Sequence, residues 1–80
     1  MKLPRDISGA DLIRRLEKRG YTVTRLIGSH VRLTKVGDPA HNITVPAHDP
    51  LRVGTLSSIL ADVAKYEGVS KETLIKQLFG

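Results

Sequence analysis

Hydrophobic residues recur at helical spacing in the first quarter of the chain. Leu12, Ile13 and Leu16 form one apolar stripe. Ser8 precedes this stripe as a good N-cap, and Gly20 follows it as a plausible terminator. The pattern therefore predicts a helix between Ser8 and Gly20.

From residue 21 onward the pattern changes to an alternation of apolar and polar positions, which is typical of strands. Three strands are predicted, over residues 21–27, 30–35 and 41–45. The first two are separated by Gly28-Ser29, and a glycine in the first position favours a two-residue type II′ hairpin turn. Pro46 ends the third strand because proline lacks the N–H that a sheet needs.

Helical spacing returns in the last third of the chain. A second long helix is predicted from near Thr55 to Gly68, and a short third helix follows Ser70 as its cap. The third helix enlarges the core in the interpretation we favour; dimerisation and the docking of a partner protein are the alternatives. The core-facing positions are Leu56, Ile59, Leu60 and Val63 in the longer helix, and Leu74, Ile75 and Leu78 in the shorter one.

This order of elements predicts an α+β fold with a three-stranded antiparallel sheet. Helices are expected on one face of the sheet, the other face is expected to be open, and a short C-terminal helix follows. Eighty residues are enough for one small core, so residues 1–80 are predicted to form a single domain.

The positive charge is confined to the first two thirds of the chain. Residues 1–54 contain ten Lys or Arg and five Asp or Glu, a net charge of +5, whereas residues 55–80 contain three of each. A partner with phosphates, or an acidic protein, is the expected complement. No cysteine, no signal peptide and no apolar run of membrane-spanning length is found, which predicts a cytoplasmic protein without membrane association.

Strand alternation places His30 on the open face, directly behind the Gly28-Ser29 turn. An imidazole exchanges protons near neutral pH, so His30 is a candidate general base or acid for RNA cleavage through the 2′-hydroxyl. The simpler interpretation is a surface histidine behind an ordinary turn. Arg25, Arg32 and Lys35 are the predicted RNA-binding residues. The open face is expected to carry Thr22, Thr24, His30, Arg32, Thr34, Asn42 and Thr44.

The other two histidines do not complete a metal site. His41 and His48 lie at different strand and loop ends, and no carboxylate recurs at ligand spacing. His48 with Asp49 is expected to serve loop hydrogen bonding or helix entry. No metal and no cofactor are therefore predicted.

Three ordered motifs together resemble a known family. They are Gly28-Ser29-His30, the segment Ile-Thr-Val-Pro-Ala-His over residues 43–48, and Leu51-x-x-Gly-Thr-Leu-x-x-Ile-Leu over residues 51–60. At these separations they resemble the HicA (YcfA-like) family of mRNA interferase toxins. The resemblance covers residues 3–65, the predicted core of the domain, and leaves residues 69–80 as a helical extension.

The resemblance implies a fold like that of double-stranded-RNA-binding domains (dsRBD-like) and metal-independent endonucleolytic cleavage of mRNA. The essential histidine of the family falls on His30, in the active-site turn with Gly28 and Ser29. A HicB-like antitoxin that covers the active face is also implied, with a hetero-oligomer as the possible result. Many short members have a second histidine directly after the first, where this chain has Val31.

Two other functions fit the same basic face. One is a non-catalytic RNA-binding module with a dsRBD-like fold, which binds RNA in a salt-dependent way without cleaving it. The other is an interaction protein whose basic face meets an acidic partner and is indifferent to RNA.

Overall fold

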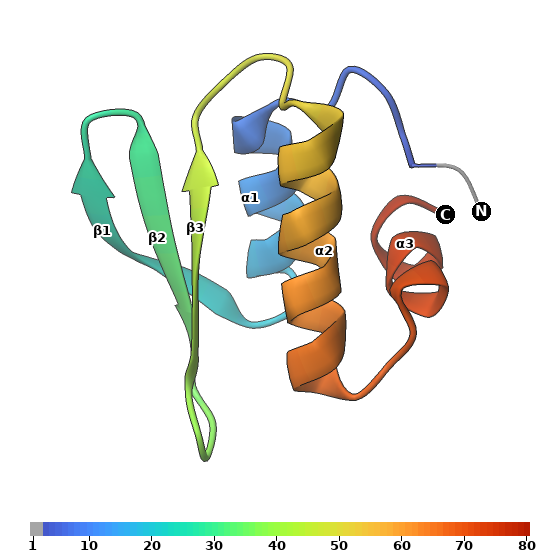
Figure 1. The fold of residues 1–80 in the computed structure, drawn as a ribbon. Helices are drawn as coiled ribbons and strands as arrows, with labels where there is room; N and C mark the ends of the chain where they lie inside the picture. Colours follow the sequence, from blue (N-terminus) through green and yellow to red (C-terminus); the bar gives the residue numbers. More distant parts are fainter. Residues whose placement is uncertain (1–2) are drawn as a thin grey trace. The chain divides into compact units, whose positions relative to one another are not determined.

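The computed structural model describes residues 3–80, so the first two residues of the predicted domain lie outside the described part. Three helices and three strands follow in the order α-β-β-β-α-α, and the strands form one antiparallel sheet (Figure 1). The predicted α+β class is therefore confirmed. Across residues 3–80, no helix combines the length and the hydropathy that crossing a membrane requires. The elements are α1 (Gly9–Glu17), β1 (Tyr21–Ile27), β2 (His30–Lys35), β3 (His41–Pro46), α2 (Val53–Glu67) and α3 (Lys71–Phe79).

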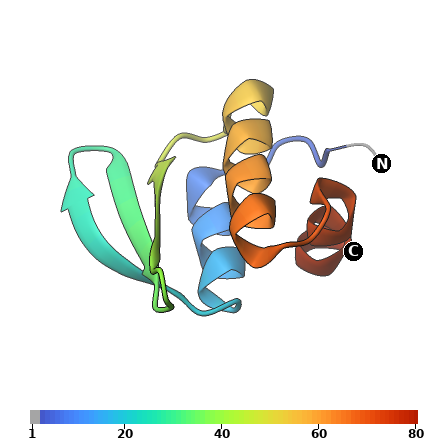
Figure 2. The same ribbon diagram turned by 60° about the horizontal axis from the view of Figure 1, so that its bottom comes forward.

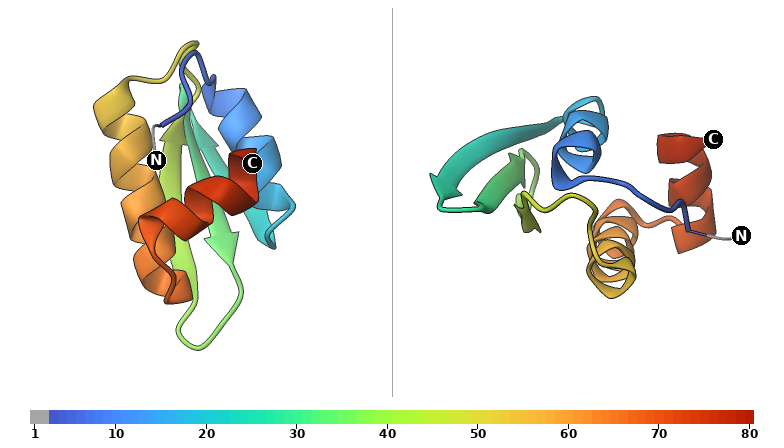
Figure 3. Two further views of the ribbon diagram at one scale, coloured as in Figure 1. Left: turned by 90° about the vertical axis from the view of Figure 1, so that its right-hand side faces the viewer. Right: turned by 90° about the horizontal axis from the view of Figure 1, so that it is seen from above.

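Residues 6–51 form one compact unit that contains α1 and the sheet. The strand order is β1-β2-β3, so β2 is the central strand, and α1 lies on one face of the sheet (Figures 2 and 3). Alternate side chains of β2 and β3 are buried on this inner face, because successive strand residues point to opposite sides. The other face, called the open face below, carries mostly polar side chains. The buried side chains of this unit include Leu12, Leu16, Val31, Leu33, Ile43 and Val45.

A β-bulge interrupts the pairing of β1 with β2. Val23 pairs with Leu33, but the next pair is Arg25 with Arg32, so Thr24 is an extra residue on β1. Strict alternation would place Arg25 on the inner face, with Val23. The bulge shifts the alternation by one residue, and Arg25 therefore lies on the open face opposite Arg32.

The hairpin turn between β1 and β2 has the predicted form. Gly28 has a φ of 57°, and Ser29 has no positive φ, which is the φ pattern of a type II′ turn. The third strand extends one residue further than predicted, because Pro46 still pairs with His30. Beyond it, the Ala47 N–H donates to the Ser29 carbonyl at 2.6 Å, which ties the turn to the end of β3.

The N-terminus of α1 lies against the same end of the sheet. The Gly9 N–H donates to the His48 carbonyl at 2.8 Å. A Cβ on Gly9 would lie 2.1 Å from the Pro46 carbonyl oxygen, so only glycine allows this close approach. The start of the helix thereby fixes the backbone of the segment that follows β3.

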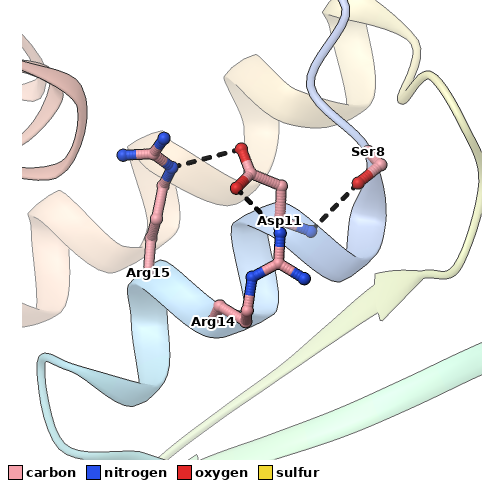
Figure 4. A network of polar contacts seen from close by, with 4 residues as sticks. All are labelled: Ser8, Asp11, Arg14 and Arg15. Atoms are coloured by element: carbon pink, nitrogen blue, oxygen red, sulfur yellow. Dashed lines mark hydrogen bonds and ion pairs between the residues drawn. The ribbon is translucent and has the colours of Figure 1, made fainter.

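Polar contacts also fix the first turns of α1 (Figure 4). The Ser8 Oγ accepts from the Asp11 N–H at 3.0 Å, as expected of an N-cap. The Asp11 carboxylate accepts from Arg14 and Arg15, each at 3.2 Å. The charges of Arg14 and Arg15 are therefore partly neutralised by a carboxylate of the same helix.

Residues 52–80 belong to a second compact unit, in which α3 packs on α2. Helix α2 begins at Val53, two residues before the predicted start, and ends at Glu67, with Gly68 as its C-cap at a φ of 69°. The Ser70 Oγ caps α3, as predicted. The Lys71 ammonium donates to the Ser57 hydroxyl, and Leu74, Ile75 and Leu78 are buried. This burial agrees with the core role that the sequence favours for the C-terminal helix.

Candidate functional site

His30 occupies the start of the central strand, directly behind the turn. It pairs with Ile27 of β1 on one side and with Pro46 of β3 on the other. Its side chain is exposed, and within residues 3–80 it makes no hydrogen bond or ion pair. Both ring nitrogens are therefore accessible to a substrate that lies on the open face.

Two arginines oppose each other next to His30. Arg32 is two residues further along β2, a separation of ~7 Å on the same face, and Arg25 is its cross-strand partner. Both are exposed, and neither guanidinium forms an ion pair within the described residues. The three strands contain no Asp or Glu. Because like charges directly opposite one another destabilise a sheet, an anion bound between them is favoured.

Further along the open face, three polar side chains are joined across all three strands. Thr24 of β1 and Thr34 of β2 have their hydroxyl oxygens 2.9 Å apart. The Thr34 hydroxyl donates to the Asn42 Oδ1 of β3 at 2.6 Å. These three residues are called the Thr–Asn network below. They lie on the open face, as the sequence predicts, and the register places Thr22 and Thr44 there as well.

Lys35 lies apart from the other predicted RNA-binding residues. It is at the far end of β2 from His30, and its cross-strand partners are Tyr21 and His41. Its ammonium is 5.7 Å from the centre of the ring of Tyr21, which is a buried residue of the inner face. The structure thus brings Arg25 and Arg32 together with His30 but does not bring Lys35 to them. A role of Lys35 in RNA binding stays a prediction.

The other two histidines have structural contacts. The His41 Nδ1 is 2.7 Å from the Tyr21 hydroxyl, and the two rings meet edge to face. His48 contributes its backbone carbonyl to the start of α1, which is the loop hydrogen bonding predicted for it. Among residues 3–80, no three His, Cys, Asp or Glu side chains are grouped closely enough to hold a metal ion.

The sequence identified His30 and Arg32 by simple alternation but did not give the position of Arg25. The available signal was a difference in length: β1 has seven residues and β2 has six. Two strands joined by a tight turn pair residue for residue, so an unequal length indicates either a bulge or an unpaired residue at a strand end. The contact of Gly9 with Pro46 was also missed at the level of the sequence, because local sequence patterns do not predict contacts between residues that are far apart in the chain.

The geometry combines an exposed imidazole, two opposed cations and a row of hydroxyl and amide groups on one face. A family model described as "HicA toxin of bacterial toxin-antitoxin" matches residues 9–64, which is more than half of the chain. The match includes α1, the whole sheet and most of α2, and α3 lies outside it. Neither a curated protein nor a solved structure gives a significant match.

Proposed function

The chain belongs to the HicA toxin family of bacterial toxin–antitoxin systems, and we propose that it is an endoribonuclease that cleaves mRNA with His30 as general base. One observation carries the proposal. The exposed imidazole of His30 directly follows a tight turn, has no side-chain partner within the described residues, and lies beside two opposed arginines. This combination supplies a proton acceptor and positive charge at the same place.

The reaction follows from the chemistry of RNA. His30 accepts the proton of a 2′-hydroxyl, and the 2′-oxygen attacks the adjacent phosphorus. The bond from phosphorus to the 5′-oxygen breaks, this oxygen takes up a proton from solvent water as it leaves, and a 2′,3′-cyclic phosphate remains. Arg25 and Arg32 stabilise the negative charge that develops on the phosphate oxygens.

The active-site turn positions the base. Gly28 allows the backbone to reverse within two residues, and the Ser29 carbonyl is held by the Ala47 N–H. His30 is therefore fixed at its backbone on both sides while its side chain stays accessible. Pre-organised groups of this kind need little rearrangement when the substrate binds.

Membership in a toxin–antitoxin family implies an antitoxin partner. In this proposal the partner is a HicB-like protein that forms a hetero-oligomer with the toxin in the cytoplasm and covers the open face. Ile27 supports this choice of surface, since this residue is 58% exposed and pairs with His30 across the turn. An apolar side chain beside the base gives a partner an anchor at the site it has to block.

The decisive experiment incubates the purified protein with a labelled RNA oligonucleotide in the presence of EDTA. We expect cleavage with 2′,3′-cyclic phosphate ends, because neither the base nor the cations of the proposed site require a metal. The matched substrate carries a 2′-deoxy sugar at the cleaved position and should stay intact. RNA that is bound but never cut would instead identify a non-catalytic RNA-binding module.

Arg25→Gln and Arg32→Gln are each expected to weaken RNA binding, and the double variant more so. Each phosphate contact that is lost should reduce the slope of log affinity against log salt by about 0.7 for a single strand. The measurement is a salt titration with 2′-O-methyl RNA, which cannot be cleaved by this mechanism. Arg14→Gln is the matched control, since Arg14 is paired with Asp11 on the helix that lies on the inner face. An Arg32→Gln slope equal to the Arg14→Gln slope would contradict the phosphate contact, and Lys35→Gln tests the third predicted contact separately.

A further inference from the structure

We propose that Asn42 is the residue through which this protein distinguishes RNA bases, with Thr24 and Thr34 as positioning residues that orient its amide. The inference rests on the proposed function, because it assigns substrate specificity to the same open face. It concerns the choice of cleavage site and not the cleavage step.

The direction of each hydrogen bond in the Thr–Asn network can be deduced. The Asn42 Oδ1 can only accept, so the single hydroxyl proton of Thr34 is used in that bond. Thr24 must therefore be the donor in its 2.9 Å contact with Thr34. The Thr24 hydroxyl is also the donor toward the Arg32 carbonyl at 3.4 Å, so its one proton is shared between two acceptors, of which the Thr34 oxygen is the nearer. The three groups thus donate in one direction, from Thr24 through Thr34 to Asn42.

This direction determines what Asn42 offers to a ligand. Its amide oxygen accepts from Thr34, and this bond holds the oxygen on the side of the amide that faces β2. The NH₂ group of the exposed Asn42 makes no hydrogen bond within the described residues and has two protons to donate. Asparagine reads adenine by using its oxygen and its nitrogen together, one as acceptor and one as donor. An Asn42 whose oxygen is held toward Thr34 presents chiefly its NH₂ group, which is suited to a base edge with acceptors, such as O6 and N7 of guanine.

The position of Asn42 indicates which nucleotide it meets. Asn42 is the cross-strand partner of Thr34, which is four residues from His30 on the same face of β2, a distance of ~14 Å along the strand. Arg25 and Arg32 lie between the two ends. The base recognised by Asn42 is therefore separated from the cleaved bond by the stretch of backbone that the two arginines hold.

Cross-strand hydrogen bonds between polar side chains also stabilise sheets, and this role alone would explain the network. The two roles differ in what they change. A purely structural network affects unfolding, and its loss lowers the activity on all RNAs by the same factor. A network that orients a reading residue changes the ratio of activities between RNAs that differ at one base.

The test measures kcat/KM on a pool of RNA oligonucleotides with randomised positions around the cleaved bond. We expect the wild-type protein to prefer guanine at one position away from this bond. Asn42→Ala should reduce that preference about tenfold. Thr34→Val should shift it toward adenine at the same position, because the released amide can then present its oxygen and nitrogen together.

Thr22→Val is the matched control. Thr22 is also a cross-strand partner of Thr34 on the open face, but it makes no side-chain hydrogen bond within the described residues, so the base preference should stay that of the wild type. Thermal unfolding of each variant shows that it is folded. Folded Asn42→Ala and Thr34→Val proteins with the wild-type preference would overturn the inference, and so would an equal loss on every RNA.

The inference and the proposed function fail in different ways. If the wild-type protein cleaves no RNA, the nuclease proposal is wrong. The same RNA pool is then separated into bound and unbound oligonucleotides, and the bases in the two fractions are compared. A guanine preference in binding that Asn42→Ala removes would support the inference in the absence of cleavage. Binding without any base preference would overturn it.

Discussion

His30→Ala is expected to lower the rate of RNA cleavage by roughly 10²–10⁴-fold, the usual contribution of a general base. The fold should be retained, because the side chain is exposed and makes no hydrogen bond within residues 3–80. Surface substitutions of this kind change stability by about 0.5 kcal/mol or less. The variant therefore separates catalysis from folding.

Cleavage of a labelled oligonucleotide gives the rate, and growth after induction of the protein without its antitoxin gives the effect in cells. We expect growth arrest with the wild type and normal growth with His30→Ala. His48→Ala is the matched control, because His48 contributes its backbone carbonyl to the fold and its exposed side chain has no assigned role. Equal toxicity of His30→Ala and the wild type would show that His30 is not the base.

Gly9→Ala should destabilise the protein by about 2–3 kcal/mol, in the upper part of the range for an added methyl group in a tightly packed place. The new Cβ would lie 2.1 Å from the Pro46 carbonyl oxygen and 3.0 Å from the Ala47 Cα. Both are backbone atoms, which cannot turn aside as the end of a side chain can. The higher helix propensity of alanine offsets only about 1 kcal/mol of this cost.

Denaturant unfolding of the two proteins measures the difference in the free energy of unfolding. Gly54→Ala in α2 is the matched control, since a Cβ at that position has nothing within 4 Å. It should leave stability unchanged or slightly raised. A Gly9→Ala protein as stable as the wild type would mean that the α1 terminus and the segment after β3 do not approach as closely as described.

The same clash should also reduce activity. Pro46 pairs with His30, and the Ala47 N–H holds the Ser29 carbonyl of the turn. A displacement of this segment therefore reaches the backbone of the proposed base. Gly9 is thus a structural residue on which the geometry of the site depends.

The first two strands were predictable to the residue because three signals agree there. Apolar and polar positions alternate, β-branched residues are frequent, and a glycine-first pair separates the strands. The start of α2 was predicted less well. Its first residues, Val53 and Gly54, precede the apolar stripe, and no side chain caps its N-terminus. Helical periodicity therefore does not reveal a first helical turn whose residues lie outside the apolar stripe and lack a capping side chain.

The candidate site was predictable only where a single strand determines it. His30 and Arg32 share a face because they are two residues apart, and no pairing information is needed. Arg25 depends on the pairing of two strands, and the donor direction at Asn42 depends on the register of three. Lys35 is an odd number of residues from His30, and it lies on the inner face as alternation requires.

The bulge at Thr24 makes the site sensitive to the number of residues in β1 as well as to their identity. Two residues, Thr24 and Arg25, lie between Val23 and Leu26, and removal of either one would restore regular pairing of β1 with β2. Deletion of Thr24 would leave Arg25 opposite Arg32 on the open face and would remove the Thr24 hydroxyl from the Thr–Asn network. Deletion of Arg25 would instead place Thr24 opposite Arg32 and remove one of the two cations. The extra residue of the bulge therefore allows the open face to carry the Thr24 hydroxyl and the Arg25 guanidinium together, and a chain without it can keep only one of the two at this place.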